Sequence, residues 1–313
     1  MGHLTTIVPA YNEPYIGKTV SSLLDNAHGE VEIIVILDGY SPPAQIGKYT
    51  FDPIPKDSRV RVIELPENVG LRAATNIGIT EASGEYVMKL DAHCAVSEGF
   101  DVALTKDCQP NWTVVPRMYN LHAYDWVCET CGKREYQGKS FVCCGNVQKE
   151  ILWKRRRRMR SDFMLFDSSM KFGYWHEYGK RPEAKGDISD QLCAIGACFL
   201  MERDRWREIG GLDERHGGWG QVGVEMACKA WLSGGKQVVN KNAWFAHMFR
   251  TGNFKGTGHN GSTFPYPLSG SDVAKAEKHS RNLWLNDKWP KAQHPLSWLV
   301  ERFAPVPTWD EST

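Results

Sequence analysis

Blocks of apolar and polar residues alternate along the first 118 positions. The branched apolar runs LTTIVPA, at 4–10, and VEIIVIL, at 31–37, predict strands that are buried on both faces. Between them, apolar residues recur at helical spacing over 14–27. The same alternation predicts, in order, a strand over 59–65, a helix over 70–82 and a strand over 85–90. Strands that alternate with helices indicate a Rossmann-like, doubly wound α/β domain.

The pattern changes after residue 119. For about 70 residues, over 120–190, the chain is rich in Cys, Arg, Lys, Tyr and Gly, and we expect an irregular insertion there. Order then returns, with a strand predicted over 193–201, helices over 203–210 and 224–235, and a strand-like segment over 242–250.

The strand over 85–90 leads into the sequence LDAHC, which places Asp91 and His93 two residues apart. Side chains at i and i+2 of an extended segment point to the same side, so this carboxylate and imidazole are able to bind one ion together. The imidazole nitrogen favours Mn²⁺ or a similar transition ion over Mg²⁺. For an isolated pair, the other interpretation is a helix N-cap followed by an ordinary loop histidine.

Asp38 follows the second predicted strand, and ligands of doubly wound sheets lie beyond the carboxyl ends of strands. Its carboxylate is predicted to accept hydrogen bonds from a base or a ribose, although an aspartate that forms a turn before glycine has the same sequence. The turn that contains Gly70, together with the helix after it, is predicted to help hold phosphate. Arg72 lies close enough in the sequence to assist.

Four of the nine cysteines lie between residues 128 and 144. In a reducing compartment such a cluster indicates a metal rather than disulfides. The predicted zinc ligands are Cys128, Cys131, Cys143 and Cys144. The alternatives are that two or three of them are buried thiols, or that His122 or His176 supplies the fourth ligand.

A basic run, KRRRRMR, lies at 154–160 in a chain of 313 residues whose net charge is only +1. This overall balance gives no general attraction to nucleic acid, so any such affinity depends on a local patch. The residues predicted to contact a polyanion such as DNA are Lys154, Arg155, Arg156, Arg157 and Arg158. The alternative is the solvated face of a helix.

The N-terminal sequence MGHLTTIVPAYNE has neither the basic region nor the apolar stretch of a secretory signal. No window approaches the roughly 18 uninterrupted apolar residues of a membrane-spanning helix. We therefore expect a soluble, cytoplasmic protein with no membrane partner.

Four segments, in order, carry a family resemblance: TTIVPAYNE, IIVILDGYS, NVGLRAATNIGI and GEYVMKLDAH. Together they resemble the nucleotide-binding half of a family 2 glycosyltransferase of GT-A fold. The Asp-x-His form is similar to that of polypeptide N-acetylgalactosaminyltransferases, whose third metal ligand is a histidine in a Gly-His-Val-Phe-Arg segment. The sequence AHMFR places His247 there. The resemblance implies that the donor is a nucleotide sugar, a UDP-sugar, and that Asp91, His93 and His247 bind Mn²⁺ or Mg²⁺. Without the resemblance, the interpretation of His247 is a polar group near a core strand.

The same resemblance implies roles for residues around the donor. The expected donor-binding residues are Pro9, Tyr11, Glu13, Asp38, Gly70, Arg72 and Asp91. Trp219 is expected to form an apolar wall for the sugar, Glu225 to orient a sugar or acceptor hydroxyl, and Arg250 to belong to a mobile lid, over 251–263, that reaches the diphosphate. Alternatively, Trp219 is a core tryptophan, Glu225 is an acid on a helix surface that pairs with Lys229, and the segment over 251–263 is a loop that only connects its neighbours.

One departure from the family pattern concerns the catalytic base. Inverting family 2 members carry Glu-Asp just before the helix over 224–235, and the retaining relatives carry Glu-Asn, whereas this chain has Val222 and Gly223. Because no carboxylate stands at the position of a base, we expect a retaining transfer in which the leaving diphosphate takes the acceptor proton.

The resemblance divides the chain into four expected parts: a nucleotide-sugar-binding half over 1–118, a Cys-rich basic insertion over 119–190, an acceptor-binding and catalytic half over 191–288, and a C-terminal extension over 289–313. The insertion suggests an acceptor such as hydroxymethylated bases in DNA, by analogy with some phage-encoded glycosyltransferases. Protein Ser/Thr or glycan acceptors are the alternative. The alternative from another functional class is a protein without catalytic activity that binds a nucleotide or a nucleic acid.

Overall fold

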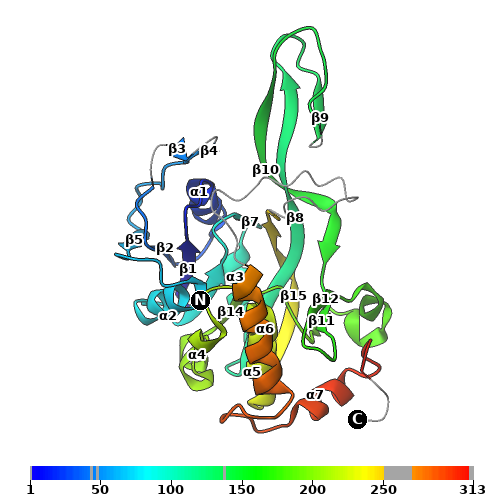
Figure 1. Cartoon of the computed structure of the whole chain (residues 1–313). Coiled ribbons are helices and arrows are strands. Elements are labelled where there is room, and N and C mark those ends of the chain that lie inside the picture. Colours follow the sequence, from blue (N-terminus) through cyan, green and yellow to red (C-terminus); the bar gives the residue numbers. More distant parts are fainter. Residues whose placement is uncertain (1, 43–44, 47–48, 137–138, 250–269, 310–313) are drawn as a thin grey trace.

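A mixed sheet of eleven strands forms the centre of the protein (Figure 1). The structure, a computed structural model, describes residues 2–42, 45–46, 49–136, 139–249 and 270–309. The main path of the sheet runs β13–β15–β8–β14–β6–β1–β2–β5. Its strands are β1 (Leu4–Ala10), β2 (Val31–Leu37), β5 (Val60–Glu64), β6 (Tyr86–Leu90), β7 (Cys94–Val96), β8 (Trp112–Cys128), β9 (Arg134–Tyr136), β10 (Val147–Ser161), β13 (Ile188–Asp190), β14 (Cys198–Glu202) and β15 (Lys236–His247).

Helices and short elements complete the fold. The helices are α1 (Ile16–Asn26), α2 (Leu71–Thr80), α3 (Phe100–Lys106), α4 (Arg203–Ile209), α5 (Val222–Leu232), α6 (Gly270–Trp284) and α7 (Leu296–Arg302), with short 3-10 turns η1 (His176–Lys180), η2 (Pro182–Ala184) and η3 (Glu214–His216). Two small sheets pair β3 (Gln45–Ile46) with β4 (Tyr49–Thr50) and β11 (Met164–Phe166) with β12 (Phe172–Tyr174). None of the helices in the described ranges is long and apolar enough to cross a membrane.

The N-terminal half confirms the predicted doubly wound pattern. Strands β5, β2, β1 and β6 are parallel neighbours, and every residue of β1 is buried. The branched apolar residues of β1 and β2 are buried because the sheet is covered on both sides there, whereas those of the edge strand β5 are partly exposed. Since β1, β2 and β6 are parallel, the polar residues that follow them meet at one edge.

Strand β7 brings the two halves of the chain together at this edge. It follows the LDAH sequence directly and pairs antiparallel with the end of β15, with His247 opposite Cys94. Its other side is held by α1, where the Thr19 hydroxyl donates to the Ala92 carbonyl (2.8 Å) and accepts from the Cys94 N–H (3.1 Å). The end of β15 therefore lies against the end of β6 although two strands separate them in the sheet.

The expectation of an irregular segment over 120–190 is wrong for much of its length. Strands β8 and β10 pair antiparallel and leave the sheet as a long two-stranded arm, with β9 near its tip (Figure 1). Strand β8 is continuous through residue 118, where the nucleotide-binding half was expected to end. We call residues 119–161 the arm.

Stacked cations and aromatic rings explain why the apolar pattern missed the arm. The Lys149 ammonium lies 4.3 Å from the centre of the Tyr124 ring, and the Arg155 guanidinium lies 4.8 Å from that of Trp244. Such pairs supplement a small apolar cluster that includes Leu121 and Tyr124, and their charged members interrupt the alternation of apolar residues that marks a strand.

Candidate active site

A cavity of about 830 Å³ lies where β1, β2, β6 and β15 end. Eight of the nine different residues predicted for the donor and the divalent ion line it, while Arg72 does not. The lining includes Pro9, Tyr11, Glu13, Asp38, Gly70, Asp91, His93, Trp219 and His247. The sequence therefore located the pocket, although the roles of its residues differ in part from those expected.

Asp91, His93 and His247 converge on one point of this cavity. The Nε2 atoms of His93 and His247 are 3.1 Å apart, and His247 Nε2 lies 3.1 Å from Asp91 Oδ2. Nitrogen and oxygen atoms from the three side chains lie within 4.8 Å of one another. The alternative of a helix cap is not observed, since β7 follows these residues.

Glu13 fixes the orientation of one imidazole. Its Oε2 accepts from His93 Nδ1 at 2.9 Å, while its Oε1 accepts the Tyr15 backbone N–H at 2.9 Å. With the proton on Nδ1, His93 presents the lone pair of Nε2 to the cavity. A carboxylate behind a histidine is the usual support of a metal-binding imidazole. Two imidazole nitrogens and a carboxylate oxygen that face one another fit a divalent transition ion.

Burial and charge set the protonation of these groups. Burial lowers the pKa of His247 to about 4, so its imidazole is neutral near pH 7. Burial raises the pKa of Asp91, but the Lys89 ammonium and the hydrogen bond with His247 outweigh this and hold it well below its ordinary value. Neutral imidazoles and an ionised carboxylate are the forms that bind metals.

Lys89 is the residue of this site that the sequence interpretation missed. It is 1% exposed, forms an ion pair with the Asp91 carboxylate, and donates to the Gly196 carbonyl at 2.9 Å. A lysine inside the otherwise apolar strand YVMKL was the available signal, because a buried ammonium requires a partner.

Asp38 lines the cavity, but its carboxylate is already bonded within the chain. Oδ1 accepts the Val69 N–H at 2.7 Å, and Oδ2 accepts the Gly70 N–H at 3.0 Å. Burial nevertheless raises its pKa. The next N–H, of Leu71, donates to the Gly218 carbonyl at 3.0 Å. These N–H groups at the start of α2 are therefore occupied, contrary to the expectation that they hold phosphate.

Arg72 and Glu225 lie in the core, and neither lines the cavity. The Arg72 Nε and the Lys229 Nζ each lie 2.9 Å from a Glu225 oxygen, and Glu225 is 0% exposed. The expectations that Arg72 assists phosphate and that Glu225 orients a hydroxyl do not fit this burial. The predicted pairing with Lys229 is present, but it is buried rather than on a helix surface.

The buried pair instead supports the wall of the cavity. The Arg72 guanidinium donates to the carbonyls of Gly217 (3.1 Å) and Gly220 (2.6 Å), the residues around Trp219. Trp219 is 48% exposed and lines the cavity, so it is not a core tryptophan. Its open indole face is the surface expected of a sugar-stacking wall.

Gly223, at the position expected of a base, has no room for a side chain. A Cβ atom there would lie 1.7 Å from the Ala194 carbonyl oxygen. The missing carboxylate thus follows from close packing of α5 on the segment before β14. Asp272, in the first turn of α6, is a further carboxylate in the described lining of the cavity. Arg250 and the predicted lid over 251–263 lie outside the described residues.

The basic run lies on strand β10, so the alternative of a helix face is wrong. Lys154 and Arg157 are exposed, whereas Arg155 and Arg156 are half-buried and stack on aromatic rings. Strand β10 also contains Arg158, whose side chain is not described.

The four clustered cysteines meet at the tip of the arm. His176, the alternative fourth ligand, stacks on Tyr174 and does not belong to this cluster.

Comparison with known proteins agrees with this geometry. The family Glycosyl transferase family 2 matches residues 5–119. A Caenorhabditis elegans protein named probable N-acetylgalactosaminyltransferase 6 is 24% identical over 290 residues, which are 90% of this chain and 42% of that protein. Human polypeptide N-acetylgalactosaminyltransferase 6 is 23% identical over 291 residues, with the same two shares. The chain thus spans less than half the length of these relatives.

Solved structures share the fold. The structure of GalNAc-T7 with UDP, GalNAc and Mn²⁺ matches with a TM-score of 0.62 and 19% identity, over 96% of this chain and 55% of that one. Staphylococcus aureus TarS 1–349 in complex with UDP-GlcNAc matches with a TM-score of 0.51 and 16% identity, over 96% and 70% of the two chains.

The fold is the GT-A fold of these structures, and residues 5–119 match the family 2 glycosyltransferase model. Over most of its length, the chain is similar to the polypeptide N-acetylgalactosaminyltransferases.

Proposed function

We propose that the protein transfers a sugar from a UDP-sugar to an acceptor hydroxyl, with a divalent cation, Mn²⁺ or Mg²⁺, held by Asp91, His93 and His247. The observation that carries this proposal is the convergence of two imidazole nitrogens and a carboxylate oxygen in the cavity. A cation held there supplies positive charge to the diphosphate leaving group. The related structures that contain UDP, Mn²⁺ or UDP-GlcNAc support this choice of donor.

Each remaining group around the cavity has a role in this proposal. Glu13 keeps the His93 Nε2 lone pair directed at the ion, and Lys89 keeps the Asp91 carboxylate ionised and fixed. Asp38 holds the 68–70 turn, which forms the wall on the nucleoside side. Trp219 offers its indole face to the sugar.

The decisive experiment is a donor-hydrolysis and transfer assay with several UDP-sugars, with Mn²⁺, Mg²⁺ or chelator. Metal-dependent release of UDP is the expected result. A folded protein that binds UDP but releases none from any sugar nucleotide would support the catalytically dead binding protein instead.

For the stereochemistry, we propose retention. The bond between the sugar carbon and the diphosphate oxygen breaks, the acceptor oxygen bonds to that carbon on the same face, and the released diphosphate oxygen takes the acceptor proton. The closed packing around Gly223 supports this route. Proton NMR of the first product identifies its anomeric configuration. An inverted product that is lost in Asp272→Asn would assign the base to Asp272 and refute retention.

Replacement of Asp38 tests the nucleoside side. In Asp38→Ala, the N–H groups of Val69 and Gly70 lose their acceptor and the turn loosens, so UDP and UDP-sugar should both bind roughly tenfold more weakly. Calorimetry with the two ligands measures this loss. Asp25→Ala, which removes an exposed aspartate of α1, is the control. A loss confined to the UDP-sugar would place Asp38 at the sugar instead.

The names of the relatives make a protein Ser/Thr hydroxyl the first candidate acceptor, and a glycan hydroxyl belongs to the same alternative. A second candidate is a polyanion such as DNA with hydroxymethylated bases. Charge distribution favours it, because the arm contains ten Lys and Arg but four Asp and Glu, while the whole chain has a net charge of +1. The arm is thus strongly basic and the rest of the chain is acidic.

Salt dependence distinguishes these acceptors. If the acceptor is a polynucleotide, Lys154→Ser with Arg157→Ser should raise the acceptor KM and flatten the dependence of log K on log salt by about 0.9 for each lost phosphate contact. Donor hydrolysis should stay unchanged. Lys56→Ser with Lys106→Ser, both exposed and outside the arm, removes the same charge as a control. Equal slopes for both variants and the parent would reject the polyanion and leave the protein or glycan acceptor.

A further inference from the structure

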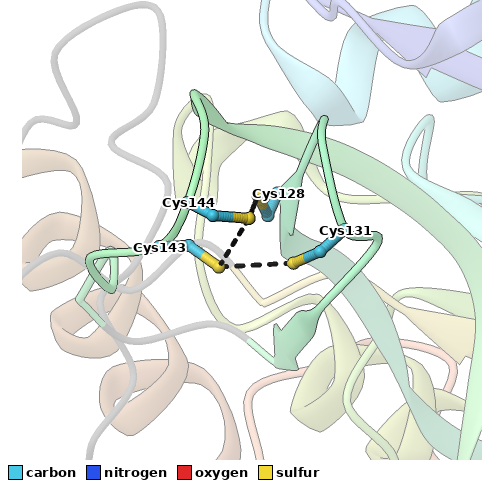
Figure 2. Close-up of side chains that lie close together, drawn as sticks. All are labelled: Cys128, Cys131, Cys143 and Cys144. Atoms are coloured by element: carbon cyan, nitrogen blue, oxygen red, sulfur yellow. Dashed lines mark hydrogen bonds between the residues drawn. The ribbon is translucent and has the colours of Figure 1, made fainter.

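Four cysteine thiols meet at the tip of the arm (Figure 2), and none of them lines the cavity. Cys128 is the last residue of β8, and Cys131 lies in the turn that follows it. Cys143 and Cys144 lie in the segment between β9 and β10. The four side chains point toward one another from two separate stretches of the chain, as Figure 2 shows.

The distances between the sulfur atoms match those of a tetrahedral metal–thiolate site. Cys131 Sγ and Cys143 Sγ are 3.3 Å apart, Cys128 Sγ and Cys144 Sγ 3.9 Å, and Cys143 Sγ and Cys144 Sγ 4.0 Å. Ligands about 2.3 Å from a central zinc ion lie about 3.8 Å from one another at tetrahedral angles. The adjacent residues Cys143 and Cys144 are thus both able to bind one ion, a question that the sequence spacing did not settle.

The turn after Cys128 has the hydrogen bonds of a metal-binding loop. The backbone N–H groups of Cys131 and Thr130 approach the Cys128 sulfur. The Gly132 N–H donates to the Cys128 carbonyl at 2.9 Å, and Gly132 has a φ of 70°. N–H groups directed at a sulfur stabilise its thiolate, which is the form that binds a metal.

Of these four cysteines only Cys128 is buried, so the alternative that two or three of them are buried thiols does not fit. Cys131 and Cys144 are exposed and Cys143 is half-buried, whereas the five cysteines outside the cluster are all buried. Val142, beside the cluster, is 99% exposed. The tip therefore has little apolar core to hold its two stretches together, and a bound metal supplies that link.

We propose that Cys128, Cys131, Cys143 and Cys144 bind one Zn²⁺ ion as thiolates, and that this ion holds the tip of the arm folded. Binding displaces the protons of those thiols that are still protonated and changes no oxidation state. Four sulfur ligands favour zinc or iron, and a single Zn²⁺ ion needs no redox partner. The site is independent of the proposed transfer reaction, since none of these cysteines lines the cavity.

The test is elemental analysis of the full-length protein purified without added metal and again after incubation with Zn²⁺ and gel filtration. The parent and Cys108→Ser, a matched control outside the cluster, should each contain one zinc per chain. Cys131→Ser with Cys143→Ser should retain less than about a tenth of it. Co²⁺ should replace the zinc in the parent and give the absorption of a tetrahedral thiolate complex.

A measurement on the parent keeps the test valid if the double variant does not fold. A chelator should release one zinc and expose the 128–146 segment to protease, while the sheet domain stays intact. Thiol titration of the denatured, unreduced parent should find all nine cysteines free. Five free thiols would identify two disulfides in the cluster, and stoichiometric iron would identify another metal; either result, or no bound zinc after incubation, overturns the proposal.

Discussion

Replacing His247 with alanine is expected to lower the metal-dependent rate of UDP-sugar hydrolysis by roughly 10²–10³-fold. A bound cation contributes several kcal/mol to the stabilisation of charge on a leaving group, and each 1.36 kcal/mol changes the rate tenfold. His247 Nε2 lies within 3.1 Å of both Asp91 Oδ2 and His93 Nε2, so its removal opens one side of the site. The same loss is expected for Asp91→Ala.

Calorimetry separates metal binding from catalysis in these variants. Binding of UDP in the presence of Mn²⁺ should weaken, while binding in chelator should not change. Glu13→Gln, which leaves the ligands in place but changes the acceptor behind His93, should lose about 10–100-fold in metal affinity. His28→Ala, an exposed histidine, is the control. The assignment of the site is wrong if both alanine variants bind UDP with Mn²⁺ as the parent does.

Replacing Glu225 with alanine is expected to lower the free energy of unfolding by about 3–5 kcal/mol, because it leaves two buried cations without their carboxylate. Both Arg72 and Lys229 are at most 3% exposed at their side chains, and each lies 2.9 Å from a Glu225 oxygen. The Asp213 backbone N–H also loses its acceptor. Chemical denaturation of the apoprotein measures the change without reference to activity.

Glu277→Ala provides the matched control for this effect. Glu277 also pairs with an arginine, Arg281, at 3.7 Å, but both side chains are partly exposed. Exposed pairs of this kind contribute about 0–1 kcal/mol. If Glu225→Ala is destabilised no more than Glu277→Ala, the buried cluster does not stabilise the fold, and its role in holding the 217–220 segment would need another explanation.

The sheet of the N-terminal half was predictable because its physical signal is local. β1, β2 and β6 are buried on both faces, so their sequences are continuous apolar runs, and the polar residues after them mark the edge where the cavity lies. The position of His247 was different. Its alignment with Asp91 depends on the pairing of β7 with β15, a tertiary contact that only the family resemblance indicated.

The residues assigned wrongly share one cause. Charged side chains such as those of Arg72 and Glu225 are usually exposed to solvent or bind a ligand. The sequence does not reveal that these two form an ion pair inside the core. The arm was missed for a related reason, because pairs such as Arg155 on Trp244 replace the apolar alternation by which a strand is recognised. The sequence suggested that the four cysteines share one site, but only the fold shows that their sulfur atoms lie within 4.8 Å of one another.

The short pairing between β7 and β15 also determines when the site forms during folding. His93 and His247 are 154 positions apart, and three residue pairs between these strands align them. Contacts between such distant positions form late, since a long loop must close first. The strands β1, β2 and β6 and the Asp38 turn all precede β15 in the chain. In the proposed site, the divalent ion therefore gains its third ligand only when β15 pairs with β7, and a chain truncated before β15 lacks His247.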